Sequence, residues 1–267
     1  MSRYASRLDY AFAVGKIRAL EKFLVKDEVF KEAVDSNLQE ALRLFVESNL
    51  YSDDLLHIKD SQQLETLLDQ ELLKVKKLIN GLVLDKKLIG LTEIENFTGT
   101  KKLVSKYKSE FLNDYLMHLI DMHNIKTFLR LYVLKEPLDV LKESLTEEGF
   151  IKRDVFIKAY NKDLSVLVHI LGYVHKRSSI VSYASFLQDA INKLEQDNSF
   201  AAVEKAIVDY LIQILRPAKY ISFGPEPLIA YYFAKVNEIN LMRMIILAKL
   251  NGVSGDLVKE RLNAVYV

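Results

Sequence analysis

Two carboxylates lie inside long apolar stretches of this chain, and their chemistry is the first thing the sequence must explain. Asp121 lies within DYLMHLIDMHNIKTFLRLYVL, and Glu238 lies within LIAYYFAKVNEINLMRMIILAKL. A carboxylate in an apolar helix is costly unless it is paired or solvated. Each acid therefore either lines a polar groove that receives a partner or forms an internal salt bridge or cap, with Arg18 and Arg243 as candidate partners. We favour the internal role.

The remaining reactive residues do not form a recognised catalytic or metal-binding pattern. There is no cysteine, which excludes thiol catalysis and thiolate metal sites. Among the five histidines, His118 and His123 are five residues apart and His169 and His175 are six apart, so neither pair shares a helical face. The motifs G-x-x-x-x-G-K-[ST], G-x-G-x-x-G and H-E-x-x-H do not occur. We expect no metal, no cofactor and no enzymatic activity.

Several other side chains could contact a partner, but each has a simpler structural explanation. Tyr115 and Tyr232 stand at helical spacing within apolar stretches, where aromatic side chains usually belong to the core. The lysines at 101, 102, 106 and 108 form a basic run that we interpret as a solvated helix face. The candidate partner-binding or structural residues are Arg18, Tyr115, Asp121, Asn124, Tyr232, Glu238 and Arg243.

Long helices are the elements that must position these residues. Only 9 glycines and 4 prolines occur among 267 residues, which favours rarely interrupted helices and predicts an all-α fold. Pro225 and Pro227 suit a first helical turn, and Asn251-Gly252 can end the helix that follows. Further helices are expected near 4–26, 27–34, 37–50, 61–79, 82–97, 101–134, 151–160, 163–172, 180–195 and 199–216.

The C-terminal stretch resembles an earlier part of the chain, displaced by 117 residues. Tyr115 then matches Tyr232, Asp121 matches Glu238, and the short segment beginning DVLKES at Asp139 matches DLVKER beginning at Asp256. Both copies consist of a long buried helix, a short connection and an amphipathic helix. The repeat predicts duplicated helical domains. We expect the first at 1–148, with an elaborated region at 60–100, and the second at 149–267.

The charge balance limits the possible partners. Lys plus Arg number 37 and Asp plus Glu number 36, so we expect no nucleic-acid binding. The most apolar stretch, 228–250, carries four internal charges, and the N-terminus lacks a signal-peptide pattern. Any contact with a membrane is therefore expected to be through a complex.

Three segments together resemble one protein family. They are YAFAVGKIRALE at 10–21, DMHNIK at 121–126, and a C-terminal pattern of Phe223-Gly-Pro-Glu-Pro, Tyr232, Glu238 and Leu241-Met-Arg243. These are similar to the C subunit of A/V-type rotary ATPases, which corresponds to the d subunit of the vacuolar enzyme. The family usually has three repeated domains, whereas this chain shows two copies of the signature.

The resemblance implies a specific role. Members of the family form a funnel of similar helical domains between the membrane rotor ring, made of proteolipid subunits, and the central stalk. They transmit torque at the cytoplasmic face without catalysis, for a motor that transports protons or sodium ions. A two-repeat form is expected either to be an open socket or to need a neighbouring protein to complete the funnel. The alternative is a free-standing helical-repeat scaffold that grips a peptide or helix in a concave face.

Overall fold

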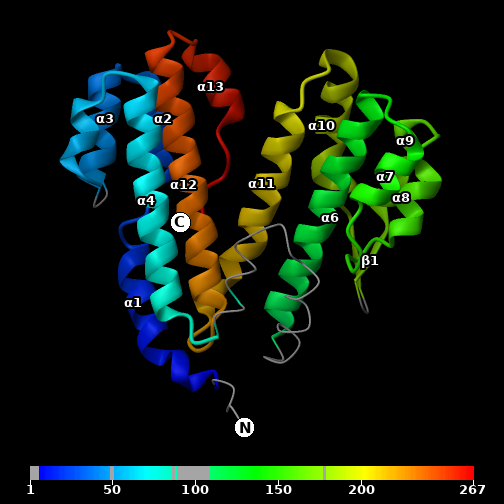
Figure 1. The fold of residues 1–267 in the computed structure, drawn as a ribbon, viewed down its shortest axis with the longest axis horizontal. Helices are drawn as coiled ribbons and strands as arrows, with labels where there is room; N and C mark the ends of the chain where they lie inside the picture. The colour runs from blue at the N-terminus through cyan, green and yellow to red at the C-terminus, as the bar shows by residue number, and fades with distance from the viewer. Residues whose placement is uncertain (1–5, 49–50, 86–87, 89–108, 177–178) are drawn as a thin grey trace. The chain divides into compact units, whose positions relative to one another are not determined.

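The computed structural model describes residues 6–48, 51–85, 88, 109–176 and 179–267 (Figure 1). The predicted all-α class is confirmed, because in this described part β-structure is limited to one hairpin of two three-residue strands. The helices predicted at 82–97 and in the first part of 101–134, and the lysine run at 101–108, lie largely or wholly outside the described residues.

The chain divides into two compact units, and their boundaries differ from two consecutive domains at 1–148 and 149–267. The first unit combines Met1–Glu93 with Ile212–Val267, and the second is Ile94–Leu211. The reason is that the long C-terminal helix α12 (Glu226–Leu250) packs against N-terminal helices. Segments from the two ends of the chain therefore share one core.

The first unit is organised around α12. The other elements of this unit are η1 (Leu8–Tyr10), α1 (Ala11–Glu21), α2 (Asp27–Asp35), α3 (Leu38–Ser48), η2 (Asp53–His57), α4 (Ser61–Leu82), η5 (Arg216–Tyr220) and α13 (Gly255–Arg261). Figure 1 shows α12 running beside α4, with α1, α2 and α3 around them. Since α12 is apolar on most faces, it is buried along most of its length. It starts after Pro225, and Gly252, with φ 65°, follows its end, as the sequence predicts.

The second unit is organised around α6 (Glu110–Val133). It continues with α7 (Leu138–Ser144), α8 (Arg153–Ala159), α9 (Leu164–Gly172), β1 (Val174–Lys176), β2 (Ser179–Val181), α10 (Ala184–Asp197) and α11 (Ala201–Leu215), whose last turn from Ile212 belongs to the first unit. The Ser109 side chain caps α6 by accepting from the N–H of Leu112 at 3.2 Å. The core of this unit combines one face of α6 with residues of α7–α11.

One predicted helix begins later than expected. The helix predicted over 180–195 starts at Ala184, because residues 179–181 pair as an antiparallel strand with 174–176. The β-branched residues Val174 and Val181 are suited to this extended pairing. The hairpin brings the chain from α9 back to Tyr183, which is fully buried.

No helix in the described ranges is both long and apolar enough to cross a membrane.

Candidate functional site

Glu238 lies on the buried side of α12 and is held by groups from both ends of the α2–α3 pair. Its Oε2 accepts a hydrogen bond from the backbone N–H of Val25 at 2.7 Å, and its Oε1 accepts from the hydroxyl of Tyr51 at 2.7 Å. Oε1 also pairs with the ammonium group of Lys235, one turn earlier on α12. Val25 precedes α2 and Tyr51 follows α3, so one carboxylate connects α12 to both ends of this helical hairpin.

Lys235 and Tyr51 also contact each other. The lysine Nζ lies 4.3 Å from the centroid of the tyrosine ring, within the range of a cation–π contact. Burial and the nearby Glu238 carboxylate raise the pKa of Tyr51 well above its usual value. The hydroxyl therefore stays protonated and remains a donor. The Glu238 site, meaning Glu238, Lys235, Tyr51 and Val25, is a buried ion pair with added hydrogen bonds.

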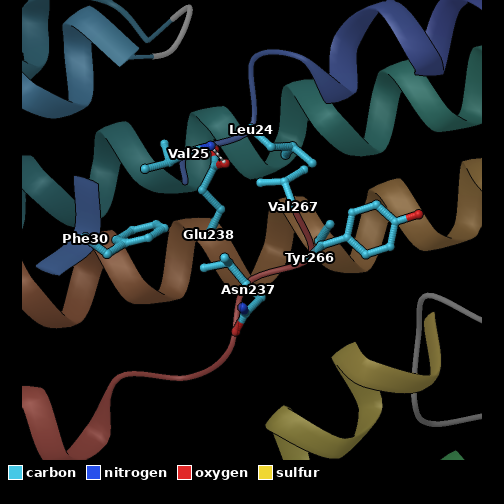
Figure 2. Close-up of a pocket in the computed structure, with 9 residues that line it drawn as sticks. Leu24, Val25, Phe30, Asn237, Glu238, Tyr266 and Val267 are labelled. Carbon is cyan, nitrogen blue, oxygen red and sulfur yellow. Dashed lines mark hydrogen bonds between the residues drawn. The ribbon is translucent and has the colours of Figure 1, made fainter. Parts of the chain in front are cut away.

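A small cavity of about 10 Å³ lies beside this site (Figure 2). Figure 2 shows Val25 and Phe30 on one side of the Glu238 side chain, with Asn237, Tyr266 and Val267 nearby. A volume of this size holds about one water molecule. Val25, Tyr51 and Lys235, which hold Glu238, all belong to the first unit.

Asp121 occupies the matching position on α6. Its Oδ1 accepts from the backbone N–H of Ile151 at 3.1 Å, and its Oδ2 accepts from the N–H of Phe150 at 3.2 Å and from the hydroxyl of Tyr183 at 2.8 Å. Asp121 is 0% exposed. A Cβ added to Gly149 would lie 2.1 Å from Oδ1, so the close approach of this segment requires glycine.

The electrostatic environment of Asp121 differs from that of Glu238. Asp121 forms no ion pair with any residue that the structure describes, and its donors are neutral. Burial raises the pKa of Asp121 to about 7, although the hydrogen bonds from Ile151, Tyr183 and Phe150 oppose this rise. The carboxyl group of Asp121 therefore changes its charge near neutral pH.

The hydrogen bonding continues beyond Asp121 to a buried histidine. The hydroxyl of Tyr183 lies 2.7 Å from Nδ1 of His118, and the hydroxyl of Tyr210 lies 3.1 Å from the same nitrogen. The rings of His118, Tyr183 and Tyr210 pack at steep angles, with centroids 5.3–5.7 Å apart. His118 is one turn before Asp121 on α6, and the hydroxyl of Tyr183 lies within hydrogen-bond distance of both side chains. Asp121, Tyr183 and His118 therefore form a continuous hydrogen-bonded chain. We call these residues, with Phe150 and Ile151, the Asp121 site.

The two sites share a plan that the 117-residue repeat did not reveal. The segment Val25-Lys26-x-x-Val29-Phe30 leads into α2, and Ile151-Lys152-x-x-Val155-Phe156 leads into α8. The first residue of each segment donates its backbone N–H to the acid of its unit, and a tyrosine that follows the next helix donates its hydroxyl. This second repeated pattern is the signal that would have pointed to Val25 and Ile151.

Asparagines make a further pair of matching contacts. Asn124 on α6 donates to the carbonyl of Thr146 at 2.8 Å and accepts from its N–H at 2.9 Å. Asn237 on α12 donates to the carbonyl of Ala264 at 2.9 Å. In both units an asparagine of the long helix therefore holds the segment that follows the short helix. Asn237 was not among the candidates from the sequence.

The two candidate arginines do not pair with the two acids. Arg18 binds Glu21 and donates to the carbonyls of Ala218 and Ile221 at 2.6 and 2.9 Å. Arg243 instead pairs with Glu65 and Asp69 at 2.9 and 3.3 Å. Five residues of helix separate Arg243 from Glu238, which rotates its side chain by about 140° to another face of α12.

Tyr115 and Tyr232 lie in the cores of their units. They are 2% and 5% exposed, and burial raises the pKa of Tyr115 well above its usual value. Tyr232 packs against Phe233 with ring centroids 5.5 Å apart. Within the described ranges, no group of three or more histidine or acidic side chains is arranged to hold a metal ion.

Comparison with known proteins identifies the family. Residues 92–261, well over half of the chain, match the family described as ATP synthase (C/AC39) subunit. The chain is also 25% identical over 155 residues to the C subunit of the V-type sodium ATPase of Enterococcus hirae. That alignment covers 58% of this chain and 44% of the relative, so this chain matches less than half of the relative's length. The matched region runs from before α6 to the end of α13 and includes both acids, and the chain belongs to the ATP synthase (C/AC39) subunit family.

Proposed function

We propose that this protein is a non-catalytic adaptor of a V/A-type ATPase, linking the membrane rotor ring to the central stalk and transmitting torque between them. The observation that carries this proposal is the family match over residues 92–261. The similarity to the C subunit of a V-type sodium ATPase supports the same assignment. The motor served by this protein would couple ATP to the transport of protons or sodium ions.

The internal construction of each unit suits a part that bears torque. α12 and α6 contain 25 and 24 residues, and each is buried along much of its length. A hydrogen-bonded carboxylate on each long helix also holds segments distant in sequence, such as Tyr51 and Val25 for Glu238. Close-packed interiors transmit strain because they have low compressibility. Each unit is therefore expected to twist little under load.

The proposed partners are the proteolipid subunits of the rotor ring and the subunits of the central stalk. The protein would contact the membrane only through this complex and would act as a peripheral component at its cytoplasmic face. We also infer that the two units derive from a duplicated helical repeat, since both place an acid, an asparagine and a tyrosine in equivalent roles.

Affinity purification tests the assignment to the complex. The tagged chain is recovered from detergent-solubilised membranes, with an untagged strain as the control. Ring, stalk and catalytic-head subunits are expected to be recovered together with the chain. Recovery of the chain with only a soluble peptide-bearing partner would support a free-standing scaffold and refute the proposal.

A coupling assay tests the adaptor role itself. Membranes from cells that lack the chain should lose ATP-driven ion transport, while their catalytic heads retain ATP hydrolysis. Re-addition of the purified chain should restore transport. Loss of hydrolysis by isolated heads, or transport that continues without the chain, would contradict a non-catalytic linking role.

A further inference from the structure

The Asp121 site contains a hydrogen-bonded chain whose direction depends on one proton. The hydroxyl of Tyr183 lies between Oδ2 of Asp121, at 2.8 Å, and Nδ1 of His118, at 2.7 Å. This hydroxyl has one proton and donates it to one neighbour at a time. When Asp121 is ionised, Tyr183 donates to the carboxylate and accepts from His118, whose Nδ1 then carries a proton. When Asp121 is protonated, the carboxyl donates to Tyr183, and Tyr183 donates to His118.

The same carboxyl group holds a defined segment of backbone. Oδ1 and Oδ2 accept from the N–H groups of Ile151 and Phe150, and Asn124 binds both backbone groups of Thr146. Residues 145–152 are thus attached to α6 through side chains of α6. Gly149 packs directly against the Asp121 carboxyl, since a Cβ added there would lie 2.1 Å from Oδ1.

The groups that face Asp121 are neutral or titratable, with no fixed cation among the described residues. They are His118 on α6, Tyr183 before α10 and Tyr210 on α11. On the attached segment, Glu147, Glu148 and Lys152 are exposed to solvent. The Glu238 site, by contrast, supplies Lys235 to balance its carboxylate. An ionised Asp121 is therefore a buried charge without a counter-ion among the described residues. Beyond its three hydrogen bonds, only contact with water could stabilise this charge.

We propose that Asp121, Tyr183 and His118 form a protonation-controlled latch that holds residues 145–152 against α6, closed when Asp121 carries a proton and released more readily as the carboxyl ionises. This inference does not rest on the function proposed above. The attached segment also forms part of the lining of an open groove of about 320 Å³, together with Arg153, Asp154 and Ile157. Release of the latch would therefore change the shape of this surface.

The direction of the pH effect follows from proton linkage. In the closed state burial raises the pKa of Asp121 to about 7, whereas a hydrated carboxyl in the open state has its usual pKa of 3.8. The closed state then binds more protons than the open state between these two values, so opening becomes easier as the pH rises through this range. Above the closed-state pKa both states are ionised, and the effect levels off.

Amide hydrogen exchange measures the latch directly. The exchange rates of the Phe150 and Ile151 amides in the full chain are divided by their intrinsic rates at pH 5.5, 6.5 and 7.5. Their protection is expected to fall roughly 20-fold between pH 5.5 and 7.5. The variant Asp121→Asn keeps an acceptor for Ile151 and a donor for Tyr183, loses the acceptor for the N–H of Phe150, and does not titrate. The protection of the Ile151 amide in this variant should be independent of pH.

A control variant and a second readout keep the test independent of folding defects. Arg243→Ala alters a surface ion pair of the first unit and should keep the wild-type pH profile at Phe150 and Ile151. The side-chain carboxyl ¹³C resonance of Asp121 in the wild-type chain should titrate near neutral pH, which requires no variant. Titration of that carboxyl near pH 4, or the same pH slope in Asp121→Asn as in the wild type, would overturn the proposal.

Discussion

Replacement of Glu238 by glutamine should strongly destabilise the first unit. The carboxylate accepts from the N–H of Val25 and the hydroxyl of Tyr51, each at 2.7 Å, and it neutralises Lys235. A glutamine of the same shape has one acceptor oxygen and an NH₂ group that cannot accept. At least one donor would then face another donor, and Lys235 would lose its counter-charge.

The size of the loss follows from the burial of these groups. Lys235 is 7% exposed and Glu238 is 3% exposed, so solvent does little to screen either charge. Removing one partner of a buried ion pair typically costs about 3–5 kcal/mol, because the other charge is left uncompensated. We therefore expect Glu238→Gln to lower the free energy of unfolding by about 3–5 kcal/mol, a large part of the 5–15 kcal/mol typical of a domain.

A double variant separates the charge from the hydrogen bonds. Lys235→Met combined with Glu238→Gln removes the unpaired ammonium group while keeping a side chain of similar length. It should recover at least about 2 kcal/mol relative to Glu238→Gln alone, because a buried ion pair can be replaced by apolar groups at little cost.

Urea denaturation followed by circular dichroism at pH 7 measures the free energy of unfolding of each variant. Hydrogen exchange read by mass spectrometry then locates the weakened peptides, which should come from α2, α3 and α12. A loss below about 1 kcal/mol for Glu238→Gln would refute this account of the buried pair. A double variant no more stable than the single one would refute it as well.

Three further substitutions test separate parts of the structure. Gly149→Ala should lower the free energy of unfolding of the second unit by about 1–3 kcal/mol, measured by urea denaturation, because the new Cβ would lie 2.1 Å from Oδ1 of Asp121. Gly81→Ala is the matched control; nothing lies within 4 Å of the added Cβ in α4, so a gain of about 0.5–1 kcal/mol is expected. Arg243→Ala should cost less than about 1 kcal/mol, read from the thermal midpoint, because Glu65 and Asp69 are 42% and 70% exposed. A large loss at Gly81 or Arg243, or none at Gly149, would contradict these contacts.

The carboxylates of Asp121 and Glu238 occupy matching positions on α6 and α12 but have different charged neighbours. Both carboxylates accept from the backbone N–H that precedes a short helix and from a tyrosine hydroxyl. Lys235 makes the Glu238 site an ion pair. The matching position on α6 is His118, which is linked to Asp121 through the hydroxyl of Tyr183.

The sequence alone determined the local elements and the positions of the two acids. Helix boundaries such as Pro225 and Gly252 were predictable because capping and backbone preference depend on neighbouring residues. The importance of Asp121 and Glu238 was also predictable, since an acid in an apolar helix must find a partner. The family resemblance was visible in the same segments that surround these residues.

Only the tertiary structure decided which partners the acids have. Tyr51 and Val25 are 187 and 213 residues from Glu238, and helical periodicity contains no information about contacts at such separations. The expected pairing of Glu238 with Arg243 failed because the two side chains leave α12 on different faces, while Lys235, one turn away, points to the same side. The charge state of each site was undetermined for the same reason, because burial and neighbouring donors set a carboxyl pKa and both depend on how distant segments pack.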